Sequence, residues 1–94
     1  MKTIILVTVF LGLSSSVFAD QGKYDDCLLK HLKNAKLDLA AHTIRMACDE
    51  NYRNSSFTSK KRRAYNECIL KHLPGVESTQ AVIGLKSACQ SKYQ

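Results

Sequence analysis

An internal repeat limits what this chain can fold into more than any other feature of the sequence. The segment that starts at Tyr24 aligns without a gap with the segment that starts at Tyr65, at a constant offset of 41 residues. Ten of the thirty aligned positions are identical, and each copy has one cysteine near its start and one near its end. A repeat of this length is typical of helix–turn–helix units, which bury their apolar faces against a neighbouring copy. We therefore expect two similar units that pack together.

The apolar residues of both copies recur with the period of an α-helix and not with the alternation of a strand. In the first copy they are Tyr24, Cys27, Leu28, His31 and Leu32, and then Leu37, Ala40, Ala41, Ile44, Ala47, Cys48 and Tyr52. In the second copy they are Tyr65, Cys68, Ile69, His72 and Leu73, and then Ala81, Val82, Leu85, Ala88, Cys89 and Tyr93. Each unit is therefore predicted to contain two amphipathic helices. Ile44 and Leu85 are expected to be buried at the centres of their apolar faces.

Turn and capping residues indicate where these helices begin and end. Residues 33–36 and 74–77 separate the two helices of each unit, and the second of these turns contains Pro74 and Gly75, which terminate helices. Residues with side chains suited to capping a helix precede three of the predicted helices. The candidates are Asp38, Thr58 or Ser59, and Ser78 or Thr79. The helix that starts after Thr58 or Ser59 should run through a basic cluster to about Leu73.

The N-terminal residues are typical of a cleavable signal peptide. Lys2 precedes an apolar run from Ile4 to Leu13, and the sequence Val17-Phe18-Ala19 has small residues where a signal peptidase requires them. The apolar run is too short for a membrane anchor, which needs about 20 residues. We therefore expect cleavage after Ala19 and no transmembrane span in the mature chain. The expected organisation is a signal peptide (1–19), a first helical hairpin (20–53), a polar and basic linker that runs into the next helix (54–63) and a second hairpin (64–94).

All four cysteines follow the predicted cleavage site, and an even number of cysteines in a short exported chain indicates disulfides. Four cysteines allow three pairings. In an antiparallel hairpin the start of the first helix lies beside the end of the second, which favours the pairs Cys27–Cys48 and Cys68–Cys89. The sequence thus predicts an all-α protein of two tandem antiparallel helical hairpins, about four helices in all, each stapled by a disulfide.

Two histidines offer an alternative role for the cysteines. His31 and His72 each follow a cysteine, Cys27 or Cys68, by four residues, so that two sulfurs and two imidazoles form a formal zinc ligand set. Export to an oxidising compartment favours disulfides over thiolate ligands. We therefore expect no metal and no other cofactor.

The residues Lys60, Lys61, Arg62 and Arg63 are the densest cluster of charge in the chain. Such a cluster is most simply a solvated helix start. It is also a candidate contact for an anionic lipid or another anionic surface, through neutralisation of phosphates, or a processing site in a eukaryotic secretory pathway. Without Lys2, thirteen Lys and Arg residues stand against eight Asp and Glu, which gives a net charge of about +5. This charge permits weak anionic-surface binding, whereas specific nucleic-acid binding is not expected.

Tyrosines occupy both ends of each predicted hairpin. They are Tyr24, Tyr52, Tyr65 and Tyr93. Aromatic rings are favoured in interfaces, so these residues are candidates for a recognition surface, although rings in such places often cap a small core. Gly84, inside the last predicted helix, lowers helix propensity and suggests close contact with a neighbouring backbone.

No combination of residues in the sequence is typical of catalysis, and we expect no enzyme and no catalytic residue. The pattern YxxCxLKHL followed by AxxxIxxAC resembles repeats in small exported bacterial proteins, a resemblance that carries no activity or site to this chain. The sequence predicts an exported, non-catalytic binding or structural module, periplasmic or extracellular. It does not identify the partner, which we expect to be a protein. The alternative is a cationic, membrane-active or toxin-like secreted protein, which would expose an apolar face to lipid.

Overall fold

The computed structural model describes residues 21–94, and the predicted signal peptide lies outside them. Within the described residues the chain is helical and contains no strand. The helices span residues 21–31, Asp38–Tyr52 (α2), Lys60–His72 (α3) and Thr79–Lys92 (α4). Short 3₁₀ helices, Leu32–Asn34 and Ser55–Phe57, lie in the first two connections. The predicted all-α class is confirmed.

Serine caps start two of the four helices. The Ser59 hydroxyl accepts a hydrogen bond from the Arg62 amide at the start of α3, and Ser78 accepts one from the Ala81 amide at the start of α4. Both caps agree with the prediction. The prediction for α2 was wrong, because Leu37 holds the cap position and Asp38 is already the first helical residue. A carboxylate in that first turn still favours the helix through the backbone dipole.

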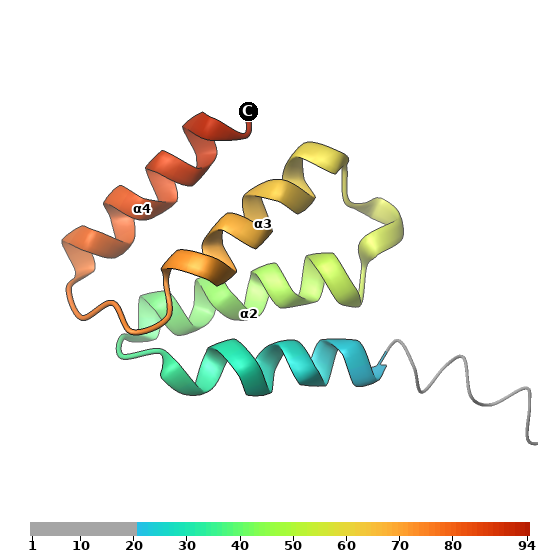
Figure 1. Cartoon of the computed structure of the whole chain (residues 1–94), viewed down its shortest axis with the longest axis horizontal. Coiled ribbons are helices and arrows are strands. Elements are labelled where there is room, and N and C mark those ends of the chain that lie inside the picture. The colour runs from blue at the N-terminus through green and yellow to red at the C-terminus, as the bar shows by residue number, and fades with distance from the viewer. Residues whose placement is uncertain (1–20) are drawn as a thin grey trace, which may run out of the picture.

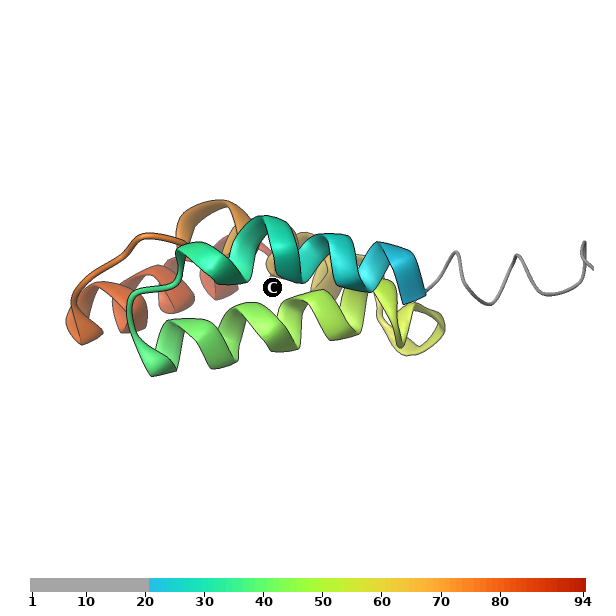
Figure 2. The same ribbon diagram turned by 90° about the horizontal axis from the view of Figure 1, so that it is seen from below.

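The four helices follow one another across the molecule in chain order, from residues 21–31 through α2 and α3 to α4 (Figure 1). Seen from below, the helix of residues 21–31 lies directly above α2, and α3 and α4 lie behind this pair (Figure 2). Gly75 forms the turn between α3 and α4 with a φ of 84°, and its amide donates to the Asn34 carbonyl at 2.8 Å. This bond joins the turn of the second hairpin to that of the first.

Each hairpin is closed by one disulfide. Cys27 bonds to Cys48 and Cys68 to Cys89, each pair with Cα atoms 5.8 Å apart and a sequence separation of 21 residues. The predicted pairing is confirmed, and no cysteine among the described residues is free. Because all four sulfurs are used in disulfides, they are not available as the ligands of the alternative zinc set.

One apolar core connects the two hairpins. Its buried members are Tyr24, Cys27, Ala40, Ile44, Ala47, Cys48, Ile69, Leu70, Leu73, Val82 and Cys89. α2 contributes the most, since it packs against the first helix on one side and against α3 on the other, whereas α4 contributes only Val82 and Cys89. None of the helices within residues 21–94 has the length and apolar character needed to cross a membrane.

Candidate functional site

A buried polar contact fixes how the two hairpins meet. The Asn66 side chain on α3 donates from Nδ2 to Oδ1 of Asn51 on α2 at 2.9 Å and to Oε1 of Glu50 at 3.0 Å. Asn51 in turn donates to the Arg63 carbonyl at 3.3 Å. Asn51 and Asn66 are 3% and 1% exposed, so their polar groups depend on these bonds for satisfaction. The α2–α3 contact therefore has one defined register.

The basic cluster divides into two parts in the structure. Lys60 and Lys61 are exposed on the first turn of α3. Arg62 instead pairs with Glu50 on α2, with Nε 2.7 Å from Oε1, and its guanidinium lies 4.5 Å from the centre of the Tyr65 ring. Arg63 is half-buried and donates to the carbonyls of Asn51 and Ser55. Both arginines therefore belong to the contact between α2 and α3.

The pairing of Glu50 with Arg62 also changes their protonation. The hydrogen bond from Arg62 holds the pKa of Glu50 below its ordinary value, against an opposing effect of partial burial, and the bond from Asn66 acts in the same direction as Arg62. The same bond raises the pKa of Arg62. Partial burial, together with the charge of Lys30, lowers the pKa of His31. The shifted carboxylate thus belongs to the contact between hairpins.

The four tyrosines differ in their surroundings. Tyr24 is 8% exposed, belongs to the core and has the Arg53 guanidinium 4.5 Å from its ring centre. Tyr52, Tyr65 and Tyr93 are half-buried. Tyr52 and Tyr93 occupy equivalent positions in the repeat, and each lines a groove beside the disulfide of its own hairpin.

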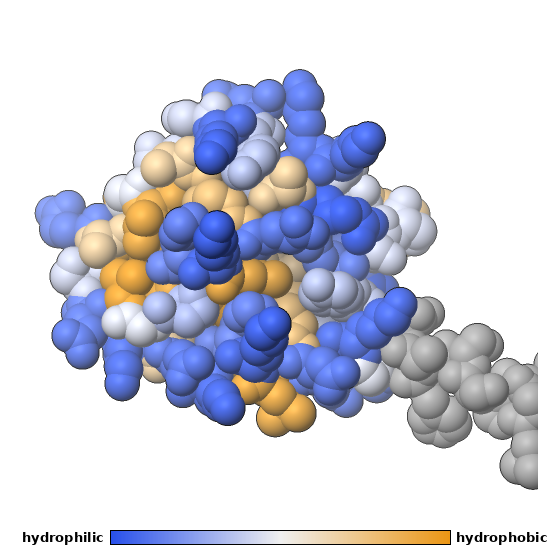
Figure 3. Space-filling model, in the orientation of Figure 1, coloured by the Kyte–Doolittle hydropathy of each residue, from blue (hydrophilic) through white to orange (hydrophobic). Residues whose placement is uncertain are grey.

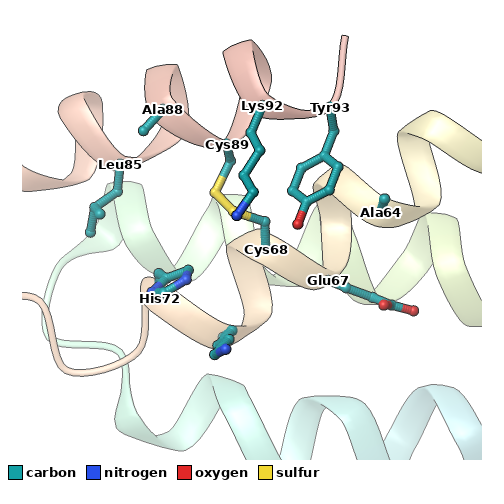
Figure 4. Close-up of a pocket in the computed structure, with 10 residues that line it drawn as sticks. Ala64, Glu67, Cys68, His72, Leu85, Ala88, Cys89, Lys92 and Tyr93 are labelled. Atoms are coloured by element: carbon teal, nitrogen blue, oxygen red, sulfur yellow. A yellow bond between two sulfur atoms is a disulfide. The ribbon is translucent and has the colours of Figure 1, made fainter.

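The larger of these two grooves runs between α3 and α4 and has a volume of about 610 Å³. Figure 4 shows the Cys68–Cys89 disulfide at its centre, with Lys92 and Tyr93 extending from α4 toward α3. The remaining lining residues are Ala64, Glu67, Lys71 and His72 from α3, and Leu85 and Ala88 from α4. The groove is thus apolar along α4 and carries charged groups along both rims.

The first hairpin has a smaller version of the same groove, of about 230 Å³. Its lining residues are Lys23, Asp26, Cys27, Lys30, His31 and Tyr52. At the offset of 41 residues each of them corresponds to a residue that lines the larger groove. The two grooves are therefore the same feature of the repeat unit, and what differs is how much of the second helix is open to solvent.

The difference comes from the face of α2 that packs against α3. This face is buried, and it comprises Ala40, Thr43, Ile44, Ala47 and Asn51. The equivalent face of α4 comprises Ala81, Gly84, Leu85, Ala88 and Lys92, of which only Leu85 is as much as half-buried. No helix among residues 21–94 covers α4 as α3 covers α2. Figure 3 shows apolar surface over the α3–α4 side of the molecule, interrupted by hydrophilic side chains.

Two expectations from the sequence fail on this face. Leu85 is not buried like its equivalent Ile44, which is 0% exposed, because the repeat position alone does not bring a covering helix to it. Gly84 does not touch the backbone of another element, since a Cβ placed there would have no described atom within 4 Å beyond its chain neighbours and its own helix backbone. The sequence marked both residues but gave no sign that their side of α4 is open.

Comparisons with known proteins place the chain in a family. No curated protein and no solved structure matches the sequence. The family described as "Four-cysteine protein VF_A0006-like" matches residues 5–93, which is nearly the whole chain. Its description agrees with the four cysteines that close the two hairpins. The chain therefore belongs to the four-cysteine VF_A0006-like family.

Proposed function

We propose that this protein is an exported, non-catalytic binding module that holds an amphipathic helix of a protein partner in the groove between α3 and α4. The observation that carries the proposal is the uncovered face of α4. Its equivalent on α2 is fully covered by a helix of the same chain, so a helix is the ligand that this type of face binds within the fold itself.

The chemistry of the groove defines the partner. Leu85, Ala88 and Ala81 present an apolar strip at helical spacing, which suits aliphatic side chains repeated every three or four residues. Lys92 and Lys71 stand on its two rims. The bound helix should therefore carry an apolar stripe with an acidic residue near Lys92.

Export and a structural role for the polar groups are parts of the same proposal. Disulfides persist in oxidising compartments, so the two disulfides support a periplasmic or extracellular location, with residues 1–19 as the signal peptide. Glu50 and Arg62 bond to each other at the α2–α3 contact, outside the groove, which supports a structural rather than a catalytic use of their charges. We further propose residues 20–53 and 64–94 as the two units, with 54–63 as the linker.

Site-specific photo-cross-linking in the expressing cell tests the proposal. A photoreactive residue at Ala88 should capture a protein segment with helical apolar periodicity, identified by mass spectrometry of the cross-linked peptide. The same residue at Gln90, which is exposed on α4 but does not line this groove, is the matched control and should capture far less. Equal capture at both positions, or no capture at Ala88, would contradict a groove that binds a helix.

The cationic, membrane-active alternative depends on fewer groups than the sequence suggested. Arg62 and Arg63 are engaged with α2 and its neighbouring loop, so Lys60 and Lys61 are the members of the cluster that point to solvent without such a contact. We retain binding to anionic surfaces as a secondary hypothesis that concerns these two lysines.

A further inference from the structure

The contact between the two hairpins has two halves, one on α2 and one on α3, and the repeat places an equivalent of each half elsewhere on the molecule. On the α3 side this contact is made by buried residues, namely Asn66, Ile69, Leu70 and Leu73. At the offset of 41 residues their equivalents on the first helix are Asp25, Leu28, Leu29 and Leu32. Leu29 is 68% exposed, and Figure 3 shows an apolar protrusion at the lower edge, over this helix.

The two open faces therefore correspond to the two halves of one existing interface. The first helix presents the α3 half, and α4 presents the α2 half. Each buried aliphatic residue of the internal contact has an apolar equivalent on an open face. For example, Ile44 corresponds to Leu85, and Leu70 corresponds to Leu29. Thr43 corresponds to Gly84, whose lack of a side chain leaves more room for an incoming helix.

The polar pair at the centre of the interface changes in a complementary way. Asn51 is replaced by Lys92 and its partner Asn66 by Asp25, both of which are exposed. A side-chain hydrogen bond between two neutral amides within the chain would become an ion pair between opposite charges across two chains. The charge needed opposite Lys92 is thus already present on the first helix of the same protein.

We propose that the helix bound in the α3–α4 groove is residues 21–31 of a second copy of this chain, docked head to tail as α3 docks on α2. The inference rests on the proposed function, because it names the occupant of the same groove. Lys92 of one copy would face Asp25 of the next, and Leu29 of the next copy would pack beside Leu85 and Ala88.

The second copy would also receive α4 in a groove of its own. A groove of about 530 Å³ lies between the first helix and α2, lined by Leu28, Leu32 and Met46 among others. Met46 is 46% exposed there. Each copy carries one face of each kind, so the interface is heterologous. A dimer would still have one free face of each kind, so assemblies larger than a dimer should form as the protein concentration rises.

Sedimentation velocity of the oxidised protein, expressed from its full gene, measures this association. The wild type should show reversible species larger than a dimer as its concentration rises. Leu29→Glu and Ala88→Glu should each weaken self-association about tenfold or more by placing a charge in an apolar contact. Both residues are exposed, so neither change disturbs the core, and unchanged circular dichroism verifies this. Gln90→Glu, at an exposed position of α4 that does not line this groove, should associate like the wild type.

A mixture of the two blocked variants gives the sharpest result. Leu29→Glu retains an intact α4 face and Ala88→Glu an intact first helix, so the mixture should form a one-to-one dimer and nothing larger. Lys92→Glu and Asp25→Lys should each weaken association, and the double variant should restore it. A mixture that stays monomeric, or a double variant as weak as the singles, would overturn the head-to-tail arrangement.

The same measurements separate this inference from the function on which it rests. If the wild type stays monomeric at every concentration while the photoreactive residue at Ala88 captures a helix of another protein, the second copy is excluded and the helix-binding groove stands. If the wild type stays monomeric and Ala88 captures nothing, both proposals fail.

Discussion

Asn66 donates its side-chain amide to the Asn51 side-chain oxygen at 2.9 Å, in a contact between α3 and α2 that is almost completely closed to solvent. Neither asparagine is kept at the equivalent position of the repeat, where the chain has Asp25 and Lys92. The pair therefore belongs to the junction between hairpins and not to the hairpin itself. It sets the register of the junction because a shift of one residue would leave buried amides unsatisfied.

Removing the side-chain amide of Asn66 should clearly lower the stability of the protein. In Asn66→Ala the side chain of Asn51 loses its donor and Glu50 loses one of its hydrogen bonds, at a cost of about 1–3 kcal/mol in the free energy of unfolding. Urea denaturation measures the change. Glu67→Ala, at the next and exposed position of α3, should change the free energy of unfolding by less than about 0.5 kcal/mol. Similar values for the two variants would mean that the pair does not hold the hairpins together.

The two glycines of the second hairpin should respond to alanine in opposite directions. A Cβ at Gly84 meets nothing within 4 Å, so Gly84→Ala should stabilise α4 by up to about 1 kcal/mol. Gly75 has a φ of 84°, a conformation that costs L-residues about 1 kcal/mol or more, so Gly75→Ala should destabilise the protein. Thermal denaturation distinguishes the two. A lower melting temperature for Gly84→Ala would show that this position touches something.

The disulfides should differ in what they hold in place. Each closes a loop of the same length, worth about 3 kcal/mol in the chain-entropy model. α4 buries only Val82 and Cys89, so it depends on its disulfide more than α2 does, which α3 covers. In Cys68→Ala/Cys89→Ala, hydrogen exchange should become fast in residues 79–92 while residues 38–72 stay protected. Loss of protection throughout the chain would show that α4 is an integral part of the core.

The sequence predicted the helices, the hairpins and the disulfide pairs because local periodicity and the mirrored cysteines determine them. It could not predict that Ile44 is buried and Leu85 partly open, because both have the same pattern and only packing by a neighbouring helix separates them. In the sequence Arg62 and Arg63 cannot be distinguished from the solvated Lys60 and Lys61, because only the packing of α3 against α2 engages the two arginines. A signal for the junction was nevertheless present: Asn51 and Asn66 depart from the repeat, and a departure at buried positions marks a contact that the repeat alone does not make.

Acid should weaken the contact between hairpins through Glu50. Its pKa is lowered in the folded protein, mainly by the hydrogen bond from Arg62, so below the ordinary value of 4.5 the unfolded chain binds more protons than the folded one. The stability that the pair contributes is therefore fully present above pH 4.5 and is lost as the pH falls through the lowered pKa. In urea titrations Glu50→Gln should be less stable than the wild type at pH 7, and the difference should shrink at pH 3. If the stability difference between Glu50→Gln and the wild type is the same at both pH values, the charge of Glu50 does not stabilise the contact.

Binding to anionic membranes should depend on Lys60 and Lys61. Both are exposed, and each cation near an anionic membrane contributes about 1 kcal/mol, enough for weak attachment that salt reverses. Co-sedimentation with anionic and neutral vesicles at low and high salt tests this. Lys60→Gln/Lys61→Gln should lose attachment to anionic vesicles and keep the melting temperature of the wild type.

Arg62→Gln/Arg63→Gln removes the same charge but should melt at a lower temperature, because both arginines bond to α2 or its following loop. Attachment that survives the lysine substitutions would move the anionic contact elsewhere on the protein, and no attachment by the wild type would leave the groove between α3 and α4 as the binding surface to pursue.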